Sequence, residues 1–308
     1  MLRRIAIAIP ARNEAERIGA CLRRLGEQPA DARIAGLRVV ILANNCDDQT
    51  VGRARAFGAD LDGRLEVRSV ALAADRAHAG WARRLALDAA AKHLRDNGDV
   101  LMSTDADTVV ARDWISRTLD HLDDGWAAVA GLARLDPRET RALAPAHRLR
   151  LARIRRYDSA LNYLKALRDP GEPWPRHFYE GGASIALTLG AYRAIGGAPT
   201  PEVGEDKALF EALRAIGGRV RHALDVRVTT SARLRGRAPG GASDTLARWG
   251  RQGEGEAVAG IATLSASLGM TSAGPAALTF ADLPAQTAAA RRLVELARGR
   301  ARVSEEAS

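Results

Sequence analysis

The stretch Gly98-Asp-Val-Leu-Met-Ser-Thr-Asp-Ala-Asp-Thr-Val-Val110 places two carboxylates directly after a short apolar run. Residues 100–102 predict a buried strand, and Asp105 and Asp107 follow where that strand ends. Open α/β sheets bind ligands at the carboxyl ends of their strands, and oxygen ligands suit Mg²⁺ or Mn²⁺ that also contacts phosphates. The stretch therefore predicts a metal-held diphosphate. Taken alone, Asp-x-Asp is more commonly a solvated turn that caps the next helix, here one begun near Arg112.

The composition predicts a protein with a full hydrophobic core. With 308 residues and 46% hydrophobic content, we expect one large domain or two intimately packed halves. The formal charge of +9 makes anionic ligands, acidic lipid surfaces and nucleic acid conceivable partners. Aromatic residues are only 4% and the basic residues are dispersed, so nucleic acid is not the expected partner. Weak peripheral membrane association stays open.

The two cysteines, Cys21 and Cys46, are too few for a disulfide framework and lack the spacing of a zinc site. A reducing compartment fits this usage. The first residues run into an apolar segment, 5–9, that is too short for a signal sequence. No run reaches the length of a membrane span. We therefore expect a soluble, cytoplasmic protein.

The first third of the chain alternates between two periodicities. Apolar runs at 5–9, 37–42, 65–70 and 100–102 are typical of buried strands, and helical patterns separate them. This alternation is the βαβ rhythm of a parallel, doubly wound sheet.

Polar residues cluster just after each of these strands. Pro10-Ala-Arg-Asn-Glu14 follows the first and Asn44 to Thr50 the second, where helix capping is the competing interpretation. After the third, Gly80 would let backbone approach a phosphate and either Arg83 or Arg84 would add charge, although two arginines on a helix are more often solvated. A long basic helical pattern spans 145–168, typical of a core helix with a solvated face or of a surface for an anionic acceptor or membrane.

Taken together, these motifs resemble a family 2 glycosyltransferase with the GT-A fold. The resemblance covers roughly residues 1–240. It implies an α/β fold with a Rossmann-like, mostly parallel central sheet flanked by helices and a helical C-terminal extension. The implied division is a nucleotide-sugar-binding half at 1–110, an acceptor-binding and catalytic half of the same domain at 111–250, and a C-terminal helical extension with a polar tail at 251–308.

The resemblance also implies roles for individual residues. Asp105 and Asp107 match the metal-binding motif, and Asp206 in the Glu205-Asp206 pair matches the catalytic base of inverting transfer, with Glu205 in support. An acid at a helix start is also explained by the helix dipole. The implied nucleotide-sugar-binding residues are Pro10, Ala11, Arg12, Asn13, Glu14, Asn44, Asp48, Gly80, Arg83, Asp105, Ala106 and Asp107. The implied acceptor-binding residues are Glu180, Gly181, Gly182, Arg248 and Trp249.

The expected activity is metal-dependent transfer of a sugar from a nucleoside-diphosphate sugar to an acceptor hydroxyl, with Mg²⁺ or Mn²⁺ as cofactor. A UDP-sugar is favoured, although Asn44 stands where the family usually has an acid that reads uracil. One alternative is a sugar nucleotidyltransferase, but its Gly-rich phosphate loop after the first strand is missing. The other is a non-catalytic basic module that binds nucleic acid or an acidic membrane.

Overall fold

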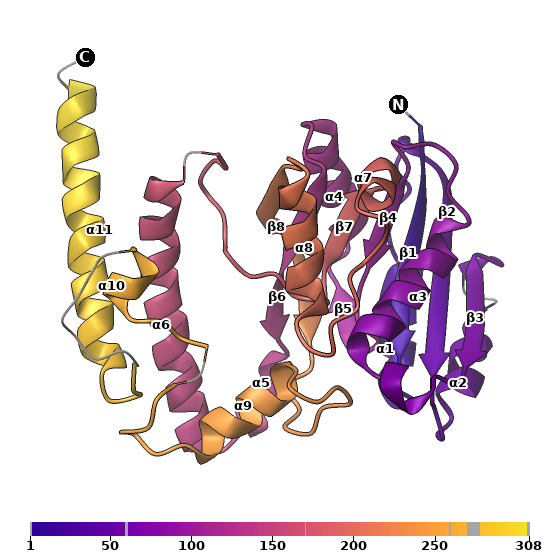
Figure 1. Ribbon diagram of the computed structural model, residues 1–308, viewed down its shortest axis with the longest axis horizontal. Coiled ribbons are helices and arrows are strands. Elements are labelled where there is room, and N and C mark those ends of the chain that lie inside the picture. Colours follow the sequence, from indigo (N-terminus) through magenta and orange to yellow (C-terminus); the bar gives the residue numbers. More distant parts are fainter. Residues whose placement is uncertain (1, 59–60, 170, 259, 270–277, 307–308) are drawn as a thin grey trace. The chain divides into compact units, whose positions relative to one another are not determined.

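The computed structural model describes residues 2–58, 61–169, 171–258, 260–269 and 278–306, and divides the chain into two compact units (Figure 1). Unit 1 comprises Met1–Asp136 and His177–Gly241, and unit 2 comprises Pro137–Arg176 and Ala242–Ser308. The predicted boundaries at 110 and 250 separate expected functional roles, whereas the compact units separate parts of the chain that pack together. Residues 137–176 form one unit with residues 242–308.

Unit 1 is built around an eight-stranded sheet with the order β3-β2-β1-β4-β7-β6-β8-β5. Its strands are β1 (Arg3–Ala11), β2 (Ile34–Asn44), β3 (Leu65–Val70), β4 (Val100–Ser103), β5 (Thr108–Val110), β6 (Ala128–Leu135), β7 (Ile185–Thr188) and β8 (Val220–Thr230). The four strands predicted in the first third of the chain are therefore confirmed, and the short β5 is an addition to them.

The predicted α/β fold is confirmed, and its sheet is mixed rather than purely parallel. β1 pairs in parallel with β2 and β4, and β2 with β3, as the βαβ rhythm requires. β7 runs antiparallel to both β4 and β6. Ser103 at the end of β4 pairs with Ile185 at the start of β7. The chain thus enters β7 at the edge where β4 ends, and so it must run the opposite way.

Helices cover both faces of this sheet, which is why its strands are apolar on both sides. Along β1, Ile5, Ile7 and Ile9 pack on the face covered by α1 and α4, while Ala6 and Ala8 meet α3 on the other face. The small alanines suit close approach of a helix. The helices of unit 1 are α1 (Ile18–Gly26), α2 (Thr50–Ala56), η2 (Ala74–Arg76), α3 (Ala79–Ala91), α4 (Trp114–Asp123), α7 (Leu189–Ala194) and α8 (Glu205–Ala215).

Unit 2 is helical. It contains α5 (Pro137–Ala142), α6 (Pro145–Arg168), α9 (Ala242–Arg251), α10 (Leu264–Ser267) and α11 (Leu283–Glu306). The predicted helix at 145–168 is confirmed, and its buried stripe of Ile154, Tyr157 and Leu161 packs against Phe280 and Leu283. Within the described residues, every helix is too short or too polar to cross a bilayer.

Asp99 stabilises the edge of the sheet at which the parallel strands β1 and β4 begin. Its side chain accepts hydrogen bonds from the backbone amides of Arg4 (2.8 Å), Arg95 (2.7 Å) and Asp96 (3.0 Å), and the residue is 2% exposed. Burial alone would raise the pKa of Asp99, but these three amides outweigh it and lower the pKa. The ionised carboxylate therefore ties β1 to the turn that precedes β4.

We expect Asp99→Asn to lower the free energy of unfolding by about 2 kcal/mol at pH 7, because an amide group must present a donor to at least one of the three N–H groups. Asp96→Asn, whose side chain is 77% exposed, is the matched control and should change stability by less than about 0.5 kcal/mol. Because the folded-state pKa of Asp99 is lowered, its contribution is present above the ordinary carboxyl pKa and disappears as pH falls through the folded value. Urea unfolding at several pH values measures both effects. An Asp99→Asn protein as stable as the parent at neutral pH would contradict the assignment.

Candidate functional site

The candidate site lies at the carboxyl edge of the sheet in unit 1. Asp105 and Asp107 lie between β4 and β5, Glu14 follows β1, and Glu205 and Asp206 begin α8. The strand directions explain this gathering, because β1 and β4 are parallel neighbours that end on the same edge. Sequence segments nearly 200 residues apart thereby contribute to one cluster of carboxylates.

Arg83 of α3 is the centre of the first half of this cluster. Its Nη2 donates to Asp105 Oδ1 (2.8 Å) and its Nε donates to Glu205 Oε1 (3.2 Å). Its Nη1 donates to Ser103 Oγ (3.0 Å) and to the carbonyl oxygen of Gly182 (3.1 Å). The guanidinium is buried, with 7% of the side chain exposed. Arg83 therefore links the predicted metal ligand Asp105 to the start of α8, and it is not a solvated helix arginine.

Asp206 is held by backbone donors on both of its oxygens. The amide of Gly182 donates to Oδ2 (2.9 Å) and that of Lys207 to Oδ1 (2.8 Å). Burial, followed by the neighbouring charge of Glu205, raises the pKa of Asp206 above its usual range. Each carboxylate oxygen keeps a second lone pair. The group is thus oriented, more basic than an ordinary aspartate, and able to accept a proton.

A second arginine, Arg233, joins the remaining acids and was not among the predicted site residues. Its Nη1 donates to Glu14 Oε2 (2.8 Å), and its Nη2 donates to Glu14 Oε1 (2.6 Å) and lies 3.1 Å from Asp107 Oδ2. Thr230 Oγ1, at the end of β8, donates to Asp107 Oδ1 (3.4 Å). The signal for Arg233 was its place three residues after a strand that ends at the same edge.

The electrostatics of the site fit a divalent cation. Five carboxylates gather here; Asp105 and Glu205 contact Arg83, and Glu14 and Asp107 contact Arg233, although the whole chain carries +9. Burial and then the charge of Asp105 raise the pKa of Asp107 to about 6, against the lowering effect of Arg233. Among the described residues, no group of three or more His, Cys, Asp or Glu side chains is arranged to hold a metal. Asp105 and Asp107 are two carboxylates that could hold Mg²⁺ or Mn²⁺, with substrate and water oxygens completing the shell.

The loops after β1 and β2 are fastened to each other. Asn13 Nδ2 donates to Asp47 Oδ1 (2.6 Å), and the Asp47 amide donates to Asn13 Oδ1 (3.0 Å). Asp48 accepts from the amides of Thr50 (2.9 Å) and Ala15 (3.1 Å). These contacts assign Asp48 a loop-bracing role, which agrees with the capping interpretation of this segment.

The other residues predicted to bind the nucleotide sugar have packing or hydrogen-bonding positions within unit 1. A Cβ at Gly80 would collide with the backbone of Thr200 and Pro201, so this glycine permits close packing of α3 against that loop. Ala106 is 2% exposed and belongs to the hydrophobic core. Asn44 is buried at the end of β2. Pro10 and Ala11 are the last residues of β1, and Arg12 Nη1 donates to the carbonyl oxygen of Ala77 (3.3 Å).

The predicted acceptor-binding residues fall in both units. Gly181 and Gly182 lie in unit 1, where Gly182 contacts Asp206 and Arg83. Glu180 is paired with His222 (3.1 Å) and with Arg214. Arg248 and Trp249 lie on α9 of unit 2. The acceptor roles of these residues stay predictions.

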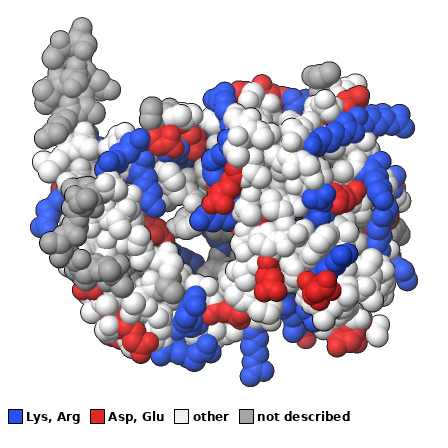
Figure 2. All heavy atoms as spheres, in the orientation of Figure 1, with Lys and Arg blue, Asp and Glu red and all other residues white. Residues whose placement is uncertain are grey.

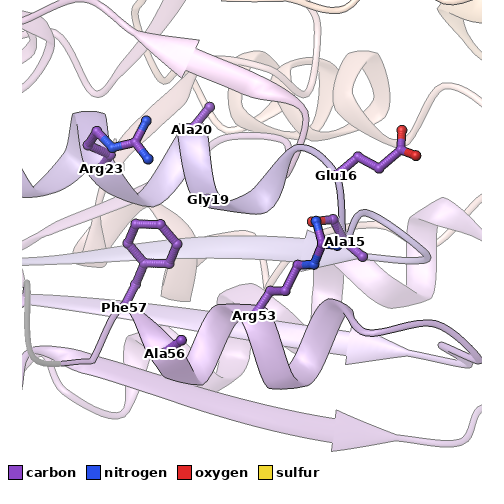
Figure 3. Close-up of a pocket in the computed structure, with 8 residues that line it drawn as sticks. All are labelled: Ala15, Glu16, Gly19, Ala20, Arg23, Arg53, Ala56 and Phe57. Carbon is purple, nitrogen blue, oxygen red and sulfur yellow. The ribbon is translucent and has the colours of Figure 1, made fainter.

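A pocket of about 330 Å³ lies elsewhere on unit 1, between α1 and α2 (Figure 3). Phe57 points from the end of α2 towards Gly19 of α1, and Arg53 reaches the Ala15 carbonyl oxygen (2.9 Å). None of its lining residues belongs to the carboxylate cluster. On the face shown in Figure 2, basic and acidic side chains are interspersed, as the dispersed arginines of the sequence predict.

Comparison with known proteins supplies a family. The model of a family described as glycosyl transferase family 2 matches residues 6–185. No protein with a curated description matches the sequence significantly. Similar solved structures include the mannosyltransferase PcManGT from Pyrobaculum calidifontis in complex with GDP-Man and Mn²⁺, with 21% identity, a TM-score of 0.54, and coverage of 77% of this chain and 59% of that one. Another is S. aureus TarS 1–349 in complex with UDP, with 13% identity, a TM-score of 0.52, and coverage of 75% and 61%. The chain thus spans about three fifths of these structures, which share its fold.

Gly182 is expected to be intolerant of substitution because a Cβ there would collide with the guanidinium of Arg83. Gly182→Ala should displace Arg83 from its buried ion pairs and lower the free energy of unfolding by about 2 kcal/mol. Gly181→Ala is the matched control, since a Cβ at that position meets nothing within 4 Å. Urea unfolding of the two variants beside the parent measures the difference. Equal stability of all three would show that Arg83 is not held where the structure has it.

Proposed function

Because the chain belongs to glycosyl transferase family 2, we propose that it transfers a sugar from a nucleoside-diphosphate sugar to an acceptor hydroxyl. The observation that carries this proposal is the bridge made by Arg83, which joins Asp105 to Glu205, the neighbour of Asp206. One buried side chain thereby fixes a candidate metal-binding carboxylate relative to a candidate base. Transfer between two substrates requires such a fixed spacing.

Asp105 and Asp107 form the donor end of the proposed site. A divalent cation held by these two carboxylates would offset the negative charge of the donor's diphosphate as the bond to the sugar breaks. Glu14, at the end of β1, is 6% exposed and faces the same edge, where its carboxylate would accept hydrogen bonds from the nucleoside. One similar structure holds GDP-Man and another UDP, so both guanine and uracil donors deserve testing.

Asp206 forms the acceptor end. In the proposed step, the acceptor oxygen forms a bond to the anomeric carbon while the bond from that carbon to the diphosphate oxygen breaks. The acceptor's proton passes to the Asp206 carboxylate, whose raised pKa favours this transfer. A direct displacement of this kind inverts the anomeric configuration. The amides of Gly182 and Lys207 hold the carboxylate in one orientation throughout.

We expect Asp107→Asn to abolish Mn²⁺-dependent nucleotide binding, because the donor site then keeps a single metal-binding carboxylate. Calorimetric titration with UDP, GDP and their sugar conjugates, in Mn²⁺, in Mg²⁺ and in chelator, is the test. Asp75→Asn, whose side chain is 75% exposed, is the control and should bind like the parent. Metal-dependent binding that survives Asp107→Asn, or no nucleotide binding by the parent, would overturn the donor site.

For Asp206→Asn we predict a loss of transfer of at least about 10²-fold with donor affinity unchanged, because only the proton acceptor is removed. Single-turnover transfer, measured beside donor titration, separates the two effects. Glu202→Gln removes an exposed acid four residues earlier and serves as the control. If Asp206→Asn transferred sugar at the parental rate, another group would have to be the base.

A further inference from the structure

Arg233 occupies an unusual position in the site. It lies in the described segment 231–241, which forms no helix or strand, and its guanidinium reaches acids that follow two different strands. Two hydrogen bonds of 2.8 and 2.6 Å join it to Glu14, and its Nη2 lies 3.1 Å from Asp107 Oδ2. Arg237 of the same segment donates from Nε to the Asn13 carbonyl oxygen (3.1 Å). The segment is thus attached across the donor side of the site.

The two arginines of the site differ in how completely they are bonded. Arg83 lies on a helix and uses Nε, Nη1 and Nη2 as donors. Arg233 lies on an irregular segment, and its Nε is buried without a hydrogen-bond partner. An unbonded buried N–H costs free energy, so this guanidinium would be better satisfied by an anion with more oxygens.

Asp107 would contact two cations at once if a divalent ion bound in this arrangement. Its Oδ2 is the oxygen that faces Arg233, and it is also one of the carboxylate oxygens that the site offers to a divalent ion. Two positive charges on one carboxylate repel each other in a poorly solvated site. Binding of the metal must therefore weaken or break the contact between Arg233 and Asp107.

We propose that Arg233 is an exchangeable counter-cation: it holds Asp107 and Glu14 in the resting protein, is displaced when a divalent cation binds, and then pairs with the donor's diphosphate. This inference rests on the proposed function. It assigns the segment 231–241 the role of a strap that closes over the bound donor. Glu14 is released at the same moment, so its carboxylate becomes available to the nucleoside.

The exchange makes binding of metal and donor cooperative. Metal alone must compete with Arg233, and its apparent affinity is reduced by the fraction of protein in which the guanidinium has left. With a nucleoside diphosphate present, the displaced guanidinium gains a phosphate partner, so each ligand strengthens the other.

The test is Mn²⁺ binding measured by electron paramagnetic resonance, without nucleotide and with UDP or GDP, whichever the parent binds. Arg233→Met removes the charge and keeps an apolar stem, and Arg235→Met is the matched control from an exposed position two residues away. We expect Arg233→Met to bind Mn²⁺ alone about tenfold more tightly than the parent, and to lose most of the enhancement that nucleotide gives. Arg235→Met should bind like the parent.

A second measurement uses the unaltered protein and needs no variant to fold. Hydrogen exchange of the amides in 232–237 should become faster with Mn²⁺ alone and slower again with Mn²⁺ and nucleotide together. If the Arg233 charge acted only at long range, the exchange rates of these amides would not change. Unchanged rates would therefore refute the proposal that the segment 231–241 moves as a strap.

The failures of this inference and of the proposed function are distinguishable. If parent and Arg233→Met bind Mn²⁺ and nucleotide equally, Arg233 is not a counter-cation while the donor site stands. If no protein binds nucleotide with or without Mn²⁺, the donor site itself is refuted.

Discussion

The site depends on the buried guanidinium of Arg83. Placing a charge in a protein interior is costly unless partners compensate it, and here Asp105, Glu205, Ser103 and the Gly182 carbonyl oxygen do so. Burial alone would lower the pKa of Arg83, but the two acids outweigh it and raise the pKa. Because these partners come from separate segments, the same ion pairs that stabilise the arginine also fix the distance between the two ends of the site.

Glycine at position 182 is the condition for that arrangement. Its missing side chain leaves room for the guanidinium, its carbonyl oxygen accepts from Arg83, and its amide donates to Asp206. One residue without a side chain thus serves both an arginine and an acid. Packing against a charged group therefore requires glycine at this position.

Much of the architecture could be predicted from the sequence, since strands buried on both faces read as continuous apolar runs and Asp105 and Asp107 follow one of them directly. The directions of β7 and β5 could not be predicted, because the sequence of a short strand does not indicate which strand it pairs with or in which direction. Likewise, the sequence placed Arg83 and Asp206 in the site but gave no sign that one side chain bridges their segments. Arg233 could not be singled out from the basic segment that follows β8, because an arginine in an irregular segment has the same local pattern whether it is solvated or paired with buried acids.

The net charge of the chain does not predict the charge of the candidate site. Residues 137–176 contain ten basic and four acidic side chains, a net +6 of the total +9. That excess belongs to unit 2, whereas the candidate site in unit 1 gathers five carboxylates around two arginines. A basic protein can therefore contain an acidic site suited to a cation. What decides the chemistry is the charge within a few ångströms of the reacting groups, because charges farther away on the surface are screened by solvent and salt.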